Sequence, residues 1–109
     1  MILRHIAERP DWDAALRSGH YRARSLETEG FIHCSTDEQL VPVAQAFFAG
    51  RADLVVLDVD TERLDAPLRW EPPVGTPPAP GPFPHVYGAI PVAAVVGVQA
   101  LADVVRTRR

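Results

Sequence analysis

The sequence contains no lysine and only one cysteine among its 109 residues. Because a single cysteine, Cys34, cannot form an internal disulfide, we expect a reducing compartment, with the cytoplasm as the simplest choice. No apolar run approaches the roughly 20 residues of a membrane-spanning helix, and the charged N-terminus is unlike a secretory signal. The net charge of −3 argues against a general nucleic-acid or membrane surface, and any protein partner is left open.

The length and composition favour one ordinary folded domain. A chain of 109 residues suits a single domain and is too short for two, so we expect one domain over residues 1–109. Apolar residues make up 47% and charged residues 23%, a balance that excludes a disordered tail, a coiled coil and a fibrous protein.

Hydrophobic periodicity and turn residues predict an α+β domain with five or six short strands and two helices in the N-terminal half. The helices are expected over residues 11–19, with Pro10 in the first turn, and over about 37–49. Residues 20–29 are predicted to be a loop with at most a short strand. The expected strands cover residues 2–7, 31–34, 54–59, 67–71, 83–88 and 93–101.

The segment GFIHCST, residues 30–36, is the first candidate for a functional site. Because side chains alternate along a strand, Phe31, His33 and Ser35 should share one face. Ser35 precedes Glu38 by three residues, which is the capping-box pattern, so we expect Ser35 to cap the following helix. That helix terminus could hold a phosphate or another anion near His33. Alternatively, Ser35 only caps the helix and His33 packs in the core.

The segment FPHVYG, residues 83–88, repeats the same alternation. Phe83, His85 and Tyr87 should share a face, and the strand is expected to begin at a sheet edge because Pro84 cannot donate a backbone hydrogen bond. We predict that the imidazoles of the two motifs open on one cleft, where they could titrate near neutral pH. The alternative is two aromatic-rich core strands with structural histidines.

Glu71 ends an expected strand directly before residues 72–82, which contain six of the eleven prolines. Its carboxylate could hold a hydroxyl group or act as a base, although a solvated carboxylate is the commoner explanation. The loop is expected on the surface beside the cleft, with Gly75 and Gly81 as bending points. It could close over a ligand or serve as a plain connection.

No local pattern indicates a metal site. The sequence has no CxxC or HExxH motif and no histidine-rich tract. His33 and His85 could act as metal ligands if carboxylates converged on them, but no neighbouring residue in the sequence supplies one. We therefore expect no metal cofactor.

Both motifs, together with Trp12, Gln39, LVVLDVD at 54–60 and Trp70-Glu71, resemble a bacterial family of small proteins of unknown function. The resemblance covers nearly the whole chain. That family is similar in fold to the ADP-ribosyltransferase superfamily, in which NAD lies in a cleft between two small β-sheets. The resemblance therefore implies an ADP-ribosyltransferase-like fold with two small packed β-sheets and a cleft. The catalytic His–Tyr–Glu and Arg–Ser–Glu sets of that superfamily are not cleanly present.

The same resemblance implies binding of NAD or a related ADP-ribosyl compound, followed by transfer or hydrolysis of ADP-ribose. One alternative is a non-catalytic module that binds a nucleotide or small metabolite. Another is a scaffold or toxin-system partner whose histidines are structural. The residues implied in catalysis are His33, His85 and Glu71. Those implied in binding the nucleotide are Ser35, Thr36 and Tyr87.

Overall fold

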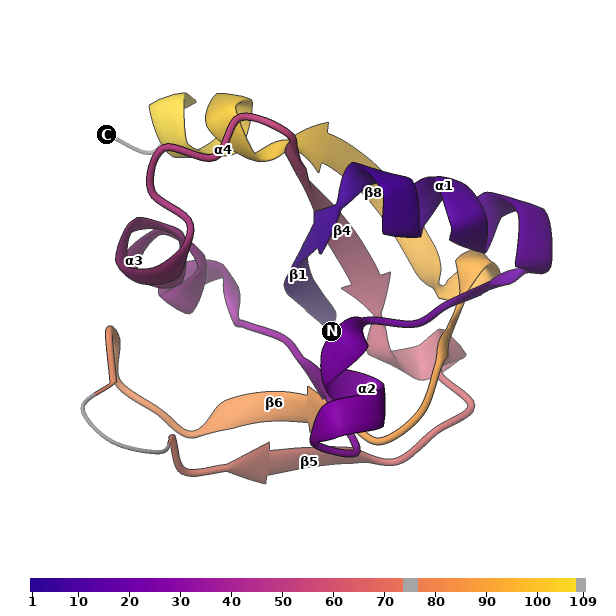
Figure 1. The fold of residues 1–109 in the computed structure, drawn as a ribbon. Helices are drawn as coiled ribbons and strands as arrows, with labels where there is room; N and C mark the ends of the chain where they lie inside the picture. Colours follow the sequence, from indigo (N-terminus) through magenta and orange to yellow (C-terminus); the bar gives the residue numbers. More distant parts are fainter. Residues whose placement is uncertain (74–76, 108–109) are drawn as a thin grey trace.

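A computed structural model, which describes residues 1–73 and 77–107, shows three small antiparallel sheets with α-helices around them (Figure 1). The prediction of an α+β chain is confirmed, but there are three sheets instead of two. The first sheet has the order β1 (Ile2–Glu8), β4 (Leu54–Asp60) and β8 (Val95–Ala100). The second has the order β3 (Ile32–His33), β6 (Phe83–Val86) and β5 (Leu68–Glu71). The third pairs β2 (His20–Tyr21) with β7 (Ile90–Pro91).

The described residues form four α-helices, two more than the sequence predicted. They are α1 (Arg9–Ser18), α2 (Arg24–Thr28), α3 (Asp37–Phe47) and α4 (Leu101–Thr107). Short 3₁₀ turns occupy Thr61–Arg63 and Val92–Ala94. None of the helices in the described part of the chain has the length and apolar character of a membrane span.

Helix α1 forms as predicted. Pro10 lies in its first turn, where its missing N–H is not needed, and Gly19 ends the helix with a φ of 89°. Trp12 and Ala15 point into the core, whereas Leu16 is exposed. The helix therefore covers one side of the first sheet with a narrower apolar stripe than the sequence suggested.

The prediction that Ser35 caps α3 is wrong. The cap is Thr36, whose hydroxyl accepts a hydrogen bond from the backbone N–H of Gln39, while the Gln39 side chain accepts one from the Thr36 N–H. Ser35 is unsuitable because its backbone exchanges two hydrogen bonds with Arg4 of β1, at 2.7 and 2.8 Å. Ser35 thus stays paired with β1. The helix begins after Thr36, at Asp37, and ends at Phe47.

The two helices missed by the sequence analysis have different origins. Helix α2 lies in the segment predicted to be a loop, and none of its five residues is buried, so it has no apolar stripe to reveal it. Helix α4 directly follows the last strand, where Leu101 and Val104 are buried. These two side chains belong to a core that forms only when distant segments come together.

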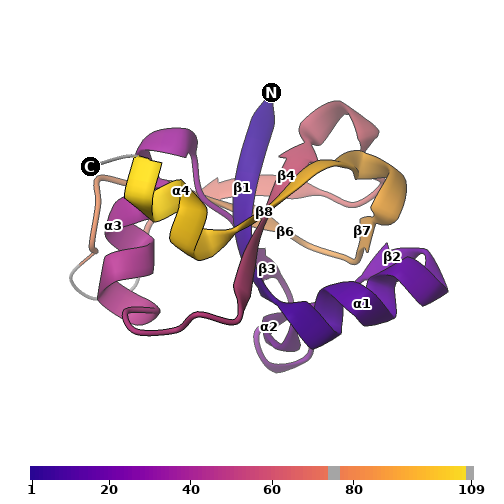
Figure 2. The same cartoon turned by 90° about the horizontal axis from the view of Figure 1, so that it is seen from above.

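Two hydrophobic cores lie on opposite faces of the first sheet. One contains Leu3 and Leu57 of the first sheet and Ile32 and Val86 of the second. The other joins α3 and α4 to β4 and includes the fully buried Leu40 and Val56. Figure 2 shows the consequence: α3 and α4 lie together on one side of β1 and β4, and α1 lies on the other.

Strand β6 is the central strand of its sheet, so the prediction that it begins at an edge is wrong. Pro84 is opposite Trp70 of β5, and its carbonyl accepts a hydrogen bond from the Cys34 N–H at 3.0 Å. In an antiparallel strand, the N–H and C=O of one residue point to the same side. The N–H that Pro84 lacks would therefore point toward Cys34, the residue directly after the end of β3 at His33.

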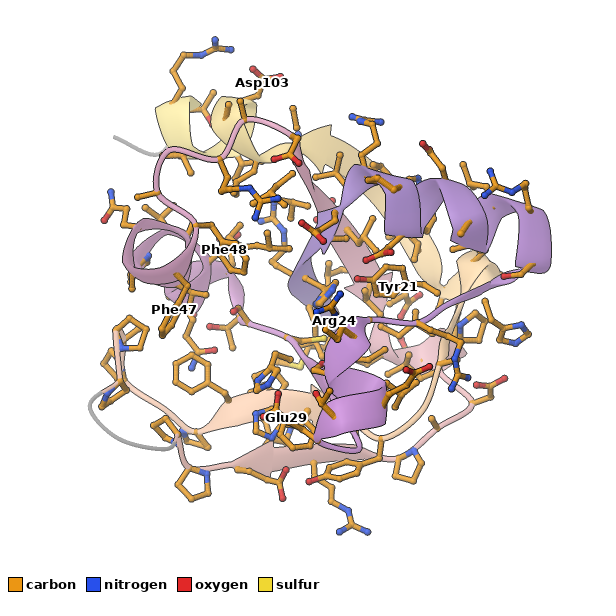
Figure 3. All side chains as sticks on the ribbon, in the orientation of Figure 1. Tyr21, Arg24, Glu29, Phe47, Phe48 and Asp103 are labelled. Carbon is orange, nitrogen blue, oxygen red and sulfur yellow. The ribbon has the colours of Figure 1, made fainter. Side chains whose placement is uncertain are left out.

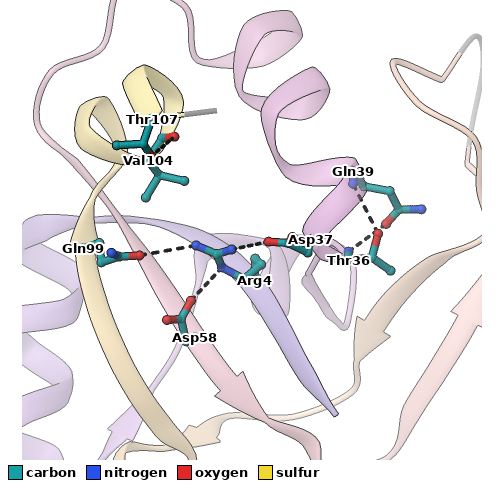
Figure 4. A network of polar contacts seen from close by, with 8 residues as sticks. All are labelled: Arg4, Thr36, Asp37, Gln39, Asp58, Gln99, Val104 and Thr107. Carbon is teal, nitrogen blue, oxygen red and sulfur yellow. Dashed lines mark hydrogen bonds and ion pairs between the residues drawn. The ribbon is translucent and has the colours of Figure 1, made fainter. Parts of the chain in front are cut away.

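A buried arginine connects α3 to the first sheet. The guanidinium of Arg4 forms ion pairs of 2.6 Å with Asp37, the first residue of α3, and with Asp58 of β4 (Figure 4). It also donates a longer hydrogen bond, of 3.5 Å, to Gln99 of β8. Only 8% of Arg4 is exposed, so these contacts fix the start of the helix over the sheet.

Candidate functional site

The two sequence motifs lie side by side in the second sheet. His33 of β3 and His85 of β6 are directly opposite each other in the antiparallel register. Their ring centroids are 5.2 Å apart and the ring planes meet at 80°. The prediction that the two histidines occupy adjacent strands is therefore confirmed.

Phe31 holds this histidine pair in an aromatic cluster. Its ring stacks on His85, with centroids 4.1 Å apart and an angle of 19° between the planes. Its ring centroid lies 4.8 Å from that of His33, which it meets edge-on. The centroid of the Tyr87 ring is 5.3 Å away, and that ring is tilted by 45°. One aromatic side chain thus restricts the orientation of both imidazoles.

The histidines open on a cleft of about 510 Å³, as the alternation of side chains predicted. Its lining includes Phe31, His33 and Ser35 from the first motif and Phe83 and His85 from the second. A cleft of this volume is within the range that binds small organic molecules.

The remaining walls of the cleft are mostly apolar. Figure 3 shows Phe47 and Phe48, which line it from the end of α3, and Glu29 at the end of α2. Four prolines of the loop after β5 contribute another wall. Those prolines are Pro72, Pro73, Pro77 and Pro78.

His85 is oriented by a carboxylate. Its Nδ1 lies 2.7 Å from Oε1 of Glu71, and the Tyr87 hydroxyl donates to the same oxygen at 2.5 Å. The hydrogen bonds from Tyr87 and His85 hold the pKa of Glu71 below its ordinary value. Because an ionised carboxylate only accepts, Nδ1 carries the proton, and neutral His85 has an unprotonated Nε2. No described residue hydrogen-bonds that Nε2.

Glu71 and Tyr87 therefore support His85 and are not among the described residues that line the cleft. Arg69, which the sequence analysis missed, lies with its guanidinium carbon 5.0 Å from the centre of the Tyr87 ring. Alternation along β5 could have found it, because Arg69 and Glu71 share a strand face. Arg69, Tyr87 and Glu71 thus form a chain of contacts that ends at the candidate catalytic residue His85.

His33 also has a carboxylate partner, and the sequence analysis did not find it. Its Nε2 lies 3.0 Å from Glu29, and about half of each side chain is exposed. The proton therefore belongs on Nε2, which leaves Nδ1 unprotonated in the neutral ring. No pattern in the sequence indicated this contact, because it depends on the turn that follows α2.

The helix terminus expected to favour an anion already has negative side chains. Asp37 and Glu38 occupy the first turn of α3, and the Thr36 hydroxyl is engaged with the Gln39 backbone. Ser35 is 6% exposed and lines the cleft. Of the two predicted binding residues in this segment, Ser35 faces the cleft and Thr36 caps the helix.

His5 is a further buried histidine at the cleft that the sequence analysis did not select. Its Nδ1 lies 2.5 Å from the backbone oxygen of His33, and its Nε2 lies 2.7 Å from the Tyr21 hydroxyl. The carbonyl only accepts, so Nδ1 donates and Nε2 accepts from Tyr21. Burial lowers the pKa of His5 to about 4. The neutral ring thus supports the backbone of the first motif.

The described part of the proline-rich loop lies beside the cleft, as expected, and its end near β6 is anchored. The Gln39 amide donates to the carbonyls of Pro80 and Pro82 at 2.8 and 2.9 Å. Gly75, one of the two expected bending points, lies outside the described residues. The idea that the loop closes over a ligand stays a prediction.

Two other kinds of chemistry lack support in the described residues. No group of three or more histidine, cysteine or acidic side chains within residues 1–73 and 77–107 is arranged to hold a metal ion. Cys34 is buried, which raises the pKa of its thiol to about 12. The thiol therefore stays protonated at neutral pH and is a poor nucleophile.

Comparison with known proteins gives a family but no activity. Residues 6–98 match the family described as "Protein of unknown function (DUF952)". The protein CC0527 from Caulobacter crescentus is 34% identical in sequence to this chain. Its crystal structure matches with a TM-score of 0.79, over 92% of this chain and 85% of CC0527. The solution NMR structure of CC0527 is 33% identical, with coverages of 91% and 83% and a TM-score of 0.72. No curated protein shows significant similarity.

Proposed function

The chain belongs to the DUF952 family of proteins of unknown function, and we propose that it is an enzyme acting on NAD or a related ADP-ribosyl compound. The observation that carries the proposal is the Glu71–His85 hydrogen bond beside a cleft of small-molecule size. A carboxylate fixes one tautomer of the imidazole, and the unprotonated Nε2 can then act as a general base. The choice of an ADP-ribosyl compound rests on the resemblance to the ADP-ribosyltransferase superfamily.

The proposed reaction is the replacement of nicotinamide on the ribose. The bond between the ribose C1′ and the nicotinamide nitrogen breaks, and both electrons leave with the nicotinamide. An acceptor hydroxyl, from water or another molecule, forms the new bond to C1′, and its proton passes to Nε2 of His85. His33 would hold a hydroxyl group of the substrate, while Glu71 and Tyr87 keep His85 oriented.

Nicotinamide release from NAD tests the proposal directly. We expect the wild-type protein to release nicotinamide, and His85→Gln to reduce the rate about 100-fold or more, as expected for loss of a general base. His20→Gln is the matched control, because His20 is half exposed and outside the cleft. Equal rates in wild type and His85→Gln would contradict the assigned role of His85.

A second candidate is a binding module that does not turn its ligand over. The observation favouring it is the lining of the cleft, in which apolar and aromatic side chains outnumber polar ones. Titration with NAD, followed through the side-chain NMR signals of His33 and His85, separates the two. Shifts without nicotinamide release would favour the binding module. An absence of both shifts and release would contradict an NAD-related function.

A further inference from the structure

The cleft has little positive charge to offer a ligand. Among the described residues that line it, Glu29 is the one carboxylate and none is an arginine. The chain contains no lysine that could take the place of an arginine. An anionic group entering the cleft would therefore meet Glu29 without a permanent positive charge in the described lining to balance it.

Two arginines near the site are engaged elsewhere. Arg4 is buried in its ion pairs with Asp37 and Asp58, and leaving them would strand two carboxylates. Arg69 lies over the ring of Tyr87 and does not line the cleft. In the first turn of α3, Asp37 is paired with Arg4 and Glu38 adds a negative charge. The residues around the cleft thus disfavour an anionic ligand, as the lining of the cleft does.

The shape and chemistry of the walls favour a flat ring. Phe31 and Phe83 line the cleft from the second sheet, Phe47 lines it from α3, and prolines line it from the loop. Aromatic faces attract the edges of other rings and also attract cations. An aromatic ring with a neutral or positive substituent fits these walls and the carboxylate of Glu29, which is half exposed and also accepts a hydrogen bond from His33 at 3.0 Å.

We propose that the cleft selects uncharged or cationic aromatic rings and rejects anionic rings of the same shape, with Glu29 as the specificity-determining residue. The inference rests on the proposed function only in taking this cleft as the ligand site. An ADP-ribosyl compound would accordingly place a ring in the cleft and keep its diphosphate outside.

Three probes of nearly equal shape test this selection: benzylamine, benzyl alcohol and benzoate, which are cationic, neutral and anionic at pH 7. Each is titrated at matched low ionic strength while the NMR signals of His33, His85 and Phe31 are followed. We expect benzylamine to bind about fivefold or more tightly than benzoate, because a partly solvated carboxylate discriminates modestly between charges. Benzyl alcohol should lie between them.

The variant Glu29→Gln assigns the effect to one side chain. It should bring the affinities for benzylamine and benzoate to within about twofold of each other, whereas Glu27→Gln should leave the preference unchanged. Glu27 is the matched control because it is exposed in α2 and does not line the cleft. Circular dichroism and thermal unfolding confirm that both variants fold.

Three results would overturn the inference: benzoate binding as tightly as benzylamine, no shift at the cleft with any probe, or an unchanged preference in Glu29→Gln. The probe experiment and the nicotinamide-release assay can succeed or fail independently of each other. Nicotinamide release can fail while the probes bind in the expected order, which would leave the cleft as a selective binding site. Release can also succeed while the probes show no preference, which would remove only the role of Glu29.

Discussion

Acidification should destabilise this protein through His5. The pKa of His5 is about 4 in the folded chain, against an ordinary value of 6.5. Between these two values the unfolded chain binds a proton that the folded chain does not, so lowering the pH favours unfolding. A shift of this size corresponds to about 3 kcal/mol of stability, present above pH 6.5 and lost by about pH 4.

Urea unfolding measured at several pH values between 7.5 and 4 tests this magnitude. Acidic side chains also titrate near the lower end, so the informative quantity is the difference between wild type and His5→Gln. Glutamine carries no titrating group and can still donate to the His33 carbonyl. We expect the stability advantage of wild type over the variant to shrink by about 3 kcal/mol as the pH falls to 4.

The control is His20→Gln, which removes an exposed histidine from β2 and should follow the wild-type pH profile. Parallel profiles for wild type and His5→Gln would refute the reasoning. They would mean that His5 takes up its proton at the same pH in the folded and the unfolded chain, so that burial does not lower its pKa. An NMR titration of the His5 ring would then show a transition near its ordinary pKa.

Two further predictions concern the start of α3. Gln39→Ala should cost about 2–4 kcal/mol in urea unfolding, because three hydrogen bonds of about 1 kcal/mol each are lost at a buried site. Gln45→Ala, on the exposed side of the same helix, should cost less than about 0.5 kcal/mol. Thr36→Ala should cost about 1 kcal/mol in the same assay, whereas Ser35→Ala should not reproduce the loss of a cap. A larger loss of stability in Ser35→Ala than in Thr36→Ala would contradict the assignment of the cap.

Alternation of side chains was enough to predict the centre of the candidate site. The pattern of Phe31 and His33 in one segment, and of Phe83 and His85 in the other, depends only on strand geometry, which is local. The pairing of the strands then brought the two faces together. This part of the site could be predicted because each strand contributes its own face regardless of the rest of the chain.

The errors arose where tertiary contacts decide between local alternatives. Ser35 and Thr36 both offer a hydroxyl group, and only the pairing of Ser35 with Arg4 selects Thr36 as the cap. Pro84 was expected at an edge, but it lies in the central strand opposite Cys34, directly after the end of the two-residue strand β3. Glu29 could not be placed because α2 has no buried side to reveal it.

Strand β6 has a consequence for how this protein could change during evolution. Pro84 and Val86 are fully buried, whereas Phe83 and His85 line the cleft and Tyr87 supports it. Chemistry and stability are therefore encoded at alternate positions of one short segment. Substitutions at 83 and 85 can change the ligand, and one at 87 can change the orientation of His85, while the packed face at 84 and 86 keeps the scaffold. Relatives with different ligands can accordingly arise from changes at only a few positions, without rebuilding the core.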